Sequence, residues 1–348
     1  MALVPELLNV SSLIRIDGGL DGRSDGVNDG ASELSRAVLV ALALVLFMFS
    51  VTAVVLNAAV MAVTLRHEQL KQPLNLALLS LAASDLGSTL TGALPVVFNT
   101  AGGQHLTGRV GCVTEGFCVA FFGISALCTV ALIAVERVFV VCKPLGTILF
   151  QQKHAVAGVG VSWMWSLVWN TPPLFGWGRY ELEGIGTSCG PDWQSPEPRN
   201  RSYIICYLLL CFAVPFLVIV VSYSWLLWTL RRMARLAGGA AAKAEARVAW
   251  MVVMMVVAFL LSWMPYTCLA LAVIFKPDIN ISPWVKMVPI YTAKSSTVYN
   301  PIIYILMNKQ FRRYIIPFLL CGKSPSPSEE ASEEETTVSP LKNKIMSD

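Results

Sequence analysis

A single lysine lies near the middle of an otherwise apolar segment, in the run Tyr291-Thr-Ala-Lys294-Ser-Ser-Thr-Val-Tyr-Asn-Pro-Ile-Ile-Tyr304. Placing an ammonium group at that depth in a membrane costs about 2.5 to 3.5 kcal/mol on insertion scales. Two interpretations account for such a residue. The lysine forms a structural ion pair between helices, or its amine is used chemically, as in a Schiff base with a carbonyl compound.

Two acidic residues in other apolar segments are candidate partners for Lys294. Glu115 lies six residues inside Arg109, roughly 9 Å below the outer end of its helix, and Lys294 lies roughly 15 Å below the outer end of its own. A lysine side chain spans that difference. Asp85 is roughly 18 Å from the inner end of its helix and therefore lies deeper in the membrane. Glu115 is accordingly the preferred counter-charge.

Composition identifies the elements that must position these residues. The chain has 348 residues, of which 55% are hydrophobic and 14% charged, and this composition excludes an ordinary soluble domain and a nucleic-acid-binding protein. Seven apolar stretches have the ~20 residues needed to cross a bilayer. They lie near 37–65, 73–98, 110–142, 155–176, 202–230, 247–275 and 284–307. The predicted fold is an all-α membrane protein, a seven-transmembrane helix bundle over residues 37–307.

Charge placement predicts the orientation of the bundle. The segments after the first, third, fifth and seventh spans carry more Lys and Arg residues than those on the other side, which places them in the cytoplasm. Residues 1–36 then form an extracellular tail in a multi-pass protein of the plasma membrane. Asn9-Val10-Ser11 is a glycosylation sequon in this tail, and it is either a modified site or a chance tripeptide.

Two of the nine cysteines lie on the predicted outer side, where a disulfide persists. Cys112 begins the third span, and Cys189 lies in the long loop after the fourth span. We expect them to form a disulfide that holds this loop over the bundle as a lid. The other cysteines show no metal-ligand spacing, and no metal site is predicted.

Several motifs, each in its expected span, carry a resemblance to a known family. They are Leu81-Ala-Ala-Ser-Asp85, Glu136-Arg137-Val138, Trp263-Met-Pro265-Tyr266, and Lys294 followed by Asn300-Pro301-Ile-Ile-Tyr304. Nearly the whole chain resembles an animal opsin of the rhodopsin-like receptor superfamily. Within the opsins, the segments around Glu115, Trp177 and Lys294 look most like the parapinopsin subfamily of non-visual opsins, followed by the parietopsins and vertebrate ancient opsins.

The resemblance implies a retinal chromophore, 11-cis in the dark and all-trans after light, bound covalently to Lys294 as a protonated Schiff base. Glu115 matches the counterion, and Glu183 in the lid loop matches a second, alternative counterion. The family pattern places five residues in the chromophore pocket, namely Gly123, Phe259, Trp263, Tyr266 and Ala293. Aromatic residues at helical spacing also occur as plain packing residues, and this alternative stays open.

The resemblance also implies a signalling role at the inner end of the bundle. A switch toward a heterotrimeric G protein of the inhibitory or transducin class is expected from Glu136, Arg137, Glu245, Asn300, Pro301 and Tyr304. Asn57 and Asp85, with Asn300, resemble a polar network that holds either water or a sodium ion.

After the seventh span, residues 308–321 alternate aromatic and basic side chains in the pattern of a short amphipathic eighth helix on the inner membrane surface. Cys321 is a candidate for palmitoylation. Residues 322–348 have the composition of a disordered cytoplasmic tail. Receptor kinases would phosphorylate this tail and arrestin would then bind it; the candidate sites are Ser324, Ser326, Ser328, Ser332, Thr336, Thr337 and Ser339. A merely solubilising tail is the alternative.

We therefore expect a light-sensing G-protein-coupled receptor in the lipid bilayer, without enzymatic turnover. Three alternatives remain open. One is a receptor for a diffusible ligand, in which Lys294 and Glu115 form a structural ion pair. A second is a retinal photoisomerase. The third is a light-driven ion pump or transporter. The lack of an acidic proton relay in the third span below Glu115 disfavours it, as do the cytoplasmic charge motif and the phosphorylatable tail.

Overall fold

The computed structural model describes residues 34–142, 150–236, 240–276, 279 and 281–320. The predicted modification sites lie outside this part of the chain: Asn9, Cys321, Ser324, Ser326, Ser328, Ser332, Thr336, Thr337 and Ser339. The side chain of Glu245 also lies outside it, although its backbone belongs to a described helix.

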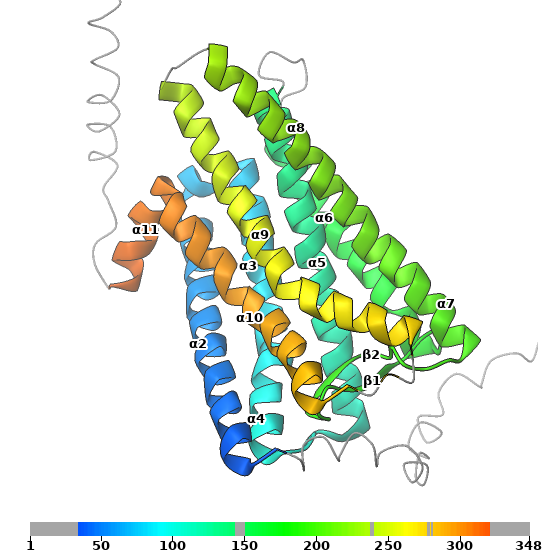
Figure 1. Cartoon of the computed structure of the whole chain (residues 1–348). Helices are drawn as coiled ribbons and strands as arrows, with labels where there is room; N and C mark the ends of the chain where they lie inside the picture. Colours follow the sequence, from blue (N-terminus) through cyan, green and yellow to red (C-terminus); the bar gives the residue numbers. More distant parts are fainter. Residues whose placement is uncertain (1–33, 143–149, 237–239, 277–278, 280, 321–348) are drawn as a thin grey trace, which may run out of the picture.

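Each of the seven predicted spans is helical in the described part of the chain (Figure 1). The first span is α2 (Arg36–Arg66), the third α5 (Gly108–Cys142), the fourth α6 (Gln152–Asn170), the sixth α9 (Ala240–Phe275) and the seventh α10 (Pro283–Met307). The second span consists of α3 (Pro73–Ser88) and α4 (Leu94–Gly102), and the fifth of α7 (Pro198–Tyr207) and α8 (Val214–Leu236). One π-helical segment joins the two parts of each divided span, Thr89–Ala93 and Leu208–Ala213.

Five of these stretches, within the described residues, are long and apolar enough to cross a membrane by length and hydropathy alone: Arg36–Arg66, Pro73–Gly102, Gly108–Val141, Pro198–Arg232 and Ala246–Phe275. The other two, α6 and α10, are more polar. The helix α10 contains Lys286 and Lys294, as well as two internal prolines, Pro289 and Pro301. An ionisable residue such as Lys294 within a span usually serves a function.

Three span boundaries differ most from the prediction. The fifth span was expected to end near 230, and α8 continues to Leu236. The fourth span was expected to continue to residue 176, but α6 ends at Asn170 because Pro172 and Pro173 follow and turn the chain into a short 3₁₀ helix, Pro172–Phe175. The sixth span was expected to start near 247 after a short flexible segment. Instead α9 begins at Ala240, since the alanine-rich run favours a helix.

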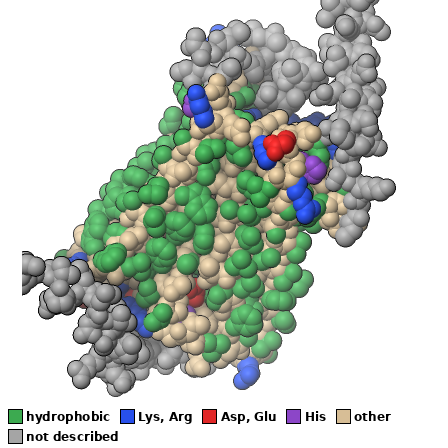
Figure 2. All heavy atoms as spheres, turned by 180° about the vertical axis from the view of Figure 1, so that it is seen from behind, with side chains coloured by type: hydrophobic (Ala, Val, Ile, Leu, Met, Phe, Trp, Pro, Cys, Tyr) green, Lys and Arg blue, Asp and Glu red, His purple; other side chains and the backbone are tan. Residues whose placement is uncertain are grey.

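The helix α5 lies in the middle of the bundle and contacts α3, α6, α8 and α9 (Figure 1). Its small and aliphatic residues belong to the largest buried cluster, with side chains from α3, α9 and α10. Hydrophobic side chains are spread over the face of the bundle that is seen in Figure 2, and basic side chains lie toward its two ends. This distribution suits a surface in contact with lipid.

A β-hairpin closes one end of the bundle. Its strands, β1 (Tyr180–Glu183) and β2 (Ser188–Pro191), are antiparallel and pair Glu183 with Ser188. Gly184 and Gly186 in the connecting turn have φ values of 67° and 81°, which residues with a Cβ rarely adopt. The hairpin therefore places Glu183 and Ser188 side by side, facing the bundle.

The predicted eighth helix is present as α11 (Lys309–Leu319). Asn308 is its N-cap residue, and its side chain accepts hydrogen bonds from the backbone of Gln310 and Phe311. Phe311, Tyr314 and Ile315 are buried, whereas Arg312 is exposed. This separation is typical of a helix that lies on a membrane surface.

Candidate functional site: a buried lysine beneath the hairpin

Lys294 of α10 and Glu115 of α5 meet beneath the hairpin. Their side chains are 6% and 3% exposed, and Lys294 Nζ lies 3.5 Å from Glu115 Oε1. The predicted approach of these two residues is confirmed. Taking both charges out of water is costly, and the pair is tolerated because each group neutralises the other and further donors surround the carboxylate.

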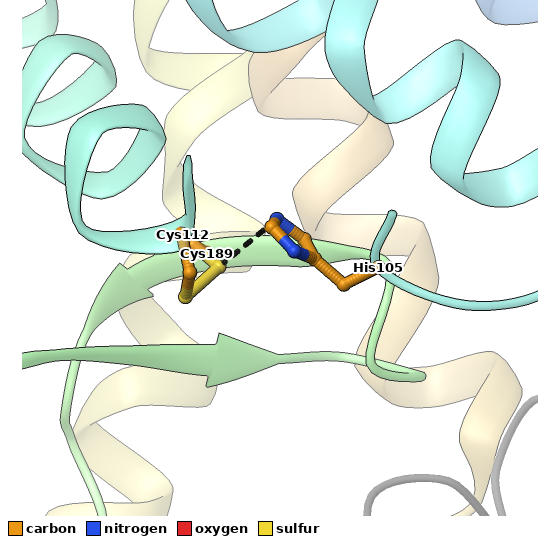
Figure 3. Close-up of side chains that lie close together, drawn as sticks. All are labelled: His105, Cys112 and Cys189. Carbon is orange, nitrogen blue, oxygen red and sulfur yellow. Dashed lines mark hydrogen bonds between the residues drawn. A yellow bond between two sulfur atoms is a disulfide. The ribbon is translucent and has the colours of Figure 1, made fainter. Parts of the chain in front are cut away.

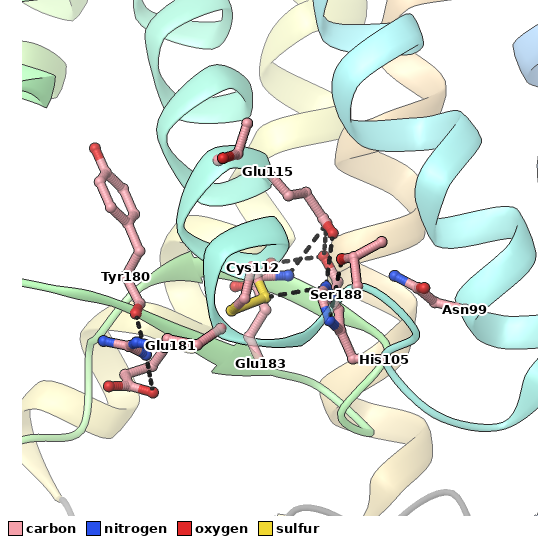
Figure 4. Close-up of a disulfide and its surroundings, with 12 residues drawn as sticks. Asn99, His105, Cys112, Glu115, Tyr180, Glu181, Glu183 and Ser188 are labelled. Carbon is pink, nitrogen blue, oxygen red and sulfur yellow. Dashed lines mark hydrogen bonds and ion pairs between the residues drawn. A yellow bond between two sulfur atoms is a disulfide. The ribbon is translucent and has the colours of Figure 1, made fainter. Parts of the chain in front are cut away.

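The carboxylate of Glu115 accepts hydrogen bonds from β2 (Figure 4). The hydroxyl of Ser188 and the backbone N–H of Cys189 each donate to Oε1 over 3.1 Å. The imidazole Nε2 of His105 lies 3.3 Å from the other oxygen, Oε2. These contacts hold a charged carboxylate in a low-dielectric site.

Glu183 lies at the same site on the hairpin. Tyr266 donates a hydrogen bond of 2.7 Å to Glu183 Oε2, and Ser188 lies 3.2 Å from Oε1. Burial raises the pKa of Glu183 above its usual range, and the charge of Lys294 and the Tyr266 hydrogen bond oppose this effect. The Ser188 hydroxyl has one proton and lies between the two carboxylates, so it can donate to only one of them at a time.

The predicted disulfide is present between Cys112 and Cys189. It ties β2 to the first turns of α5, and Cys189 is also the residue whose N–H donates to Glu115. Arg109 adds a second attachment, since its guanidinium donates to the carbonyl oxygen of Tyr180 and pairs with Glu181. The hairpin that carries Glu183 is thus held over the bundle by a covalent bond, and the exposed Arg109 contacts add to this attachment.

Replacing Cys112 and Cys189 together with serine is expected to destabilise the chain by about 2 to 5 kcal/mol, as for other native disulfides. The bridge closes a long loop, with a sequence separation of 77, and its loss frees that loop in the unfolded state and loosens the hairpin in the folded one. Thermal unfolding in detergent measures the change. The matched control replaces Cys268, an exposed free cysteine of α9, with serine, and an equal loss of stability there would contradict the prediction.

An apolar pocket extends from Lys294 into the bundle. All five predicted wall residues line it, namely Gly123, Phe259, Trp263, Tyr266 and Ala293. The ring of Trp263 packs against Phe259 and Tyr266, and its indole N–H donates to Ser296. A Cβ at position 123 would lie 3.3 Å from this ring, so glycine keeps the space open.

These residues fit a bound retinal. An apolar pocket with an aromatic wall suits a hydrocarbon polyene, and a lysine amine within it, opposite a carboxylate, suits condensation with an aldehyde. Glu183 lines this pocket, whereas Glu115 contacts the Lys294 amine from beside it.

The other predicted residues lie deeper in the bundle. Asn300 donates a hydrogen bond of 2.9 Å to Asp85, and Asn57 donates to the carbonyl oxygen of Thr297. Further along α5, the guanidinium of Arg137 binds both carboxylate oxygens of Glu136, and both residues are buried. Tyr304 of α10 is fully buried. A hydrogen bond therefore links Asp85 of α3 to Asn300 of α10, and Arg137 is paired with the adjacent Glu136.

Sequence reasoning missed His105 and Ser188, although both contact Glu115. His105 lies in the segment between α4 and α5, and Ser188 immediately precedes a disulfide cysteine. The one available signal was their position along the chain: the predicted disulfide draws residue 188 to the start of α5, where the segment containing residue 105 also ends.

Comparison with known proteins agrees with this arrangement. Residues 56–304 match the model of the 7 transmembrane receptor (rhodopsin family). The chain is 54% identical to parapinopsin of Ictalurus punctatus over 85% of its length and 87% of that protein. It is 41% identical to pinopsin of Columba livia, covering 89% of this chain and 90% of pinopsin.

A solved structure, squid rhodopsin, superimposes with a TM-score of 0.77 and 28% sequence identity, over 87% of this chain and 92% of that one. The predicted seven-transmembrane fold and the resemblance to parapinopsin are thus confirmed. The chain belongs to the rhodopsin family of seven-transmembrane receptors and, within that family, to the animal opsins, which are light-sensing membrane receptors.

Proposed function

We propose that this receptor binds retinal covalently at Lys294 and that light absorbed there switches a G protein of the inhibitory or transducin class. The observation that carries the proposal is the buried Lys294 amine, which lines an apolar pocket and lies 3.5 Å from the Glu115 carboxylate. When bound, retinal supplies a light-absorbing polyene that isomerises from 11-cis to all-trans, and an aldehyde carbon that joins Lys294 as a protonated Schiff base.

The residues around Lys294 have separate tasks in this proposal. Glu115 is the counterion in the dark, because its carboxylate faces the amine and accepts three further contacts. Glu183 is the alternative counterion, and Tyr266 and Ser188 orient its carboxylate. Gly123, Phe259, Trp263 and Ala293 form the walls that exclude water, and Trp263 senses the shape of the bound molecule.

The residues that would signal to the G protein lie toward the end of the bundle opposite the hairpin. Arg137, held by Glu136 in this structure, is the residue that rearranges on activation, and Glu245 at the start of the sixth span contributes to its inactive position. Asn300, Pro301 and Tyr304 transmit motion of α10, since Pro301 interrupts the hydrogen bonds of that helix. Asp85, Asn57 and Asn300 form the polar network between the two ends. A two-state element of this kind is what ligand-controlled switching requires.

The proposed topology places residues 1–36 outside the cell, with Asn9 as a glycosylation site, and α11 on the cytoplasmic surface of the plasma membrane. Cys321 would anchor the chain after α11 by palmitoylation. Residues 322–348 would be the substrate of a receptor kinase and, once phosphorylated, the binding site of an arrestin. We propose no enzymatic turnover beyond isomerisation of the bound chromophore.

Reconstitution with retinal in the dark tests this function. We expect a pigment with an absorbance band that free retinal lacks, and light-dependent nucleotide exchange on a purified inhibitory G protein. The same exchange measurement on purified Gs and Gq heterotrimers shows which class of G protein the receptor activates. Without an absorbance band, the diffusible-ligand interpretation would replace the proposal. A pigment that releases isomerised retinal after light without activating any G protein would indicate a photoisomerase.

A further inference from the structure

The side chain of His105 is buried beside Glu115, and none of the roles described above uses it. It lies between the end of α4 at Gly102 and the start of α5 at Gly108. Its side chain is only 5% exposed, and the imidazole lies against the Cys112–Cys189 disulfide (Figure 3). A buried histidine needs a polar partner for each ring nitrogen.

Both nitrogens of His105 have a partner. Nε2 lies 3.3 Å from Glu115 Oε2 and 3.5 Å from Cys189 Sγ, and Nδ1 lies 3.5 Å from the hydroxyl of Thr107. An ionised carboxylate only accepts hydrogen bonds, so we assign the hydrogen to Nε2, as the donor to Glu115. The Thr107 hydroxyl is placed to donate to Nδ1 in this arrangement.

A metal site does not explain this cluster. His105 Nε2 and the two sulfur atoms lie close enough together to surround an ion. Metal-binding cysteines are thiolates, whereas Cys112 and Cys189 are joined in a disulfide. Glu115 is the stronger acceptor in the vicinity, and the imidazole is better explained as its donor.

The two oxygens of Glu115 have different neighbours. Oε1 faces Lys294 and accepts from Ser188 and the N–H of Cys189, whereas Oε2 faces only His105 among the contacts above. The charged or titratable groups around the imidazole are thus Glu115 from α5, Lys294 from α10 and, through Ser188, Glu183 from β1. His105 is the contact made by the carboxylate oxygen that is not paired with Lys294.

We propose that His105 is a positioning residue for the Glu115 counterion. Its Nε2–H fixes the rotation of the carboxylate so that Oε1 points toward Lys294, and it draws part of the negative charge toward Oε2. The inference rests on the proposed function, in which Lys294 carries the chromophore. The segment before α5 would then help to set the strength of the ion pair between Lys294 and Glu115, on which the chromophore depends.

Infrared spectroscopy of the chromophore-free chain in lipid nanodiscs tests the contact directly. Subtracting the spectrum of Glu115→Gln isolates the carboxylate stretching bands of Glu115. We expect His105→Phe, which keeps a ring and removes the donor, to shift these bands, and His105→Gln, which restores an N–H donor, to return them toward the wild-type position. The matched control is His67→Phe, since the His67 ring packs at a tilted angle against Tyr314, away from this site, and phenylalanine keeps a ring there.

Unchanged Glu115 bands in His105→Phe would overturn the proposal. If His105→Phe does not fold, nitrogen NMR of the wild-type chain decides the matter. The chain has only 3 histidines, so the His105 signals are assigned by their loss in His105→Gln. A hydrogen on Nε2 supports the proposal, and a bare Nε2 contradicts it.

The retinal-loaded protein gives a second readout. With the donor removed, more negative charge faces Lys294, and we expect His105→Phe to absorb at a shorter wavelength than wild type, with recovery in His105→Gln. An unchanged absorbance maximum in His105→Phe would contradict the charge-drawing part of the proposal. If the wild-type chain forms no pigment, the proposed function fails, whereas the infrared and NMR results still decide whether His105 holds Glu115.

Discussion

Replacing Lys294 with alanine is expected to abolish pigment formation completely. The side chain supplies the amine that would join retinal, and it lines the pocket. Retinal added in the dark to Lys294→Ala should leave only the absorbance of the free aldehyde. Acid denaturation before the measurement distinguishes covalent from trapped retinal, because only a covalent adduct keeps a shifted absorbance band in the unfolded chain.

The matched control is Lys286→Ala, since Lys286 lies on the same helix two turns nearer its start. That variant should form pigment as wild type does. Removing Lys294 also leaves Glu115 buried without its cation, which typically costs 3 to 5 kcal/mol for a broken buried pair. The double variant Lys294→Ala with Glu115→Gln removes this cost and should fold well and still form no pigment. Pigment formation in either Lys294 variant would refute the assignment.

The meeting of Lys294 and Glu115 could be predicted because a helix has a fixed rise per residue. Counting from the helix ends gave the two side chains compatible depths, and the structure places their charged atoms 3.5 Å apart. The seven spans followed from hydrophobic length in the same way. The end of the fourth span was wrong because hydropathy alone does not register that Pro172 and Pro173 stop the helix.

The polar contacts of the carboxylates could not be predicted in this way. Ser188 and His105 reach Glu115 from a hairpin and from a connecting segment, whose paths depend on the disulfide and on backbone turns such as those at Gly184 and Gly186. No periodic pattern specifies the position of such residues. Asp85 shows the complementary case. Its depth followed from the helix rise, whereas its association with Asn300 was implied only by the family resemblance and is set by how α3 and α10 pack.

Glu183→Gln is expected to leave the dark pigment largely intact and to destabilise the product formed by light. Glu115 is the carboxylate that faces Lys294 in this structure. Glu183 is hydrogen-bonded to Tyr266 and Ser188, and burial raises its pKa, so it holds a proton more readily than an exposed glutamate. Once light changes the shape of the bound molecule, Ser188 can turn its hydrogen bond from Glu115 to Glu183, and a proton passed from Glu183 to Glu115 would leave the negative charge on Glu183.

Absorbance spectra of Glu115→Gln and Glu183→Gln, recorded in the dark and after light, measure the two roles separately. An opposite charge nearby shifts the pKa of an ionisable group by about 1 to 3 units. The light product of Glu183→Gln lacks this charge beside Lys294, so it should decay roughly tenfold faster or more. Glutamine keeps the size of the side chain and still accepts the Tyr266 hydrogen bond. Glu115→Gln should instead alter the dark spectrum.

The control for the hairpin is Glu181→Gln. Glu181 lies two residues before Glu183 on β1, is 41% exposed and pairs with Arg109, so its replacement perturbs the same strand without touching the site. Its light product should decay as in wild type, because an exposed ion pair contributes little. If Glu115→Gln alone destabilises the light product, Glu115 serves in both states and the division of work between the two carboxylates is wrong. If Glu181→Gln matches Glu183→Gln, the effect comes from hairpin stability rather than from the charge of Glu183.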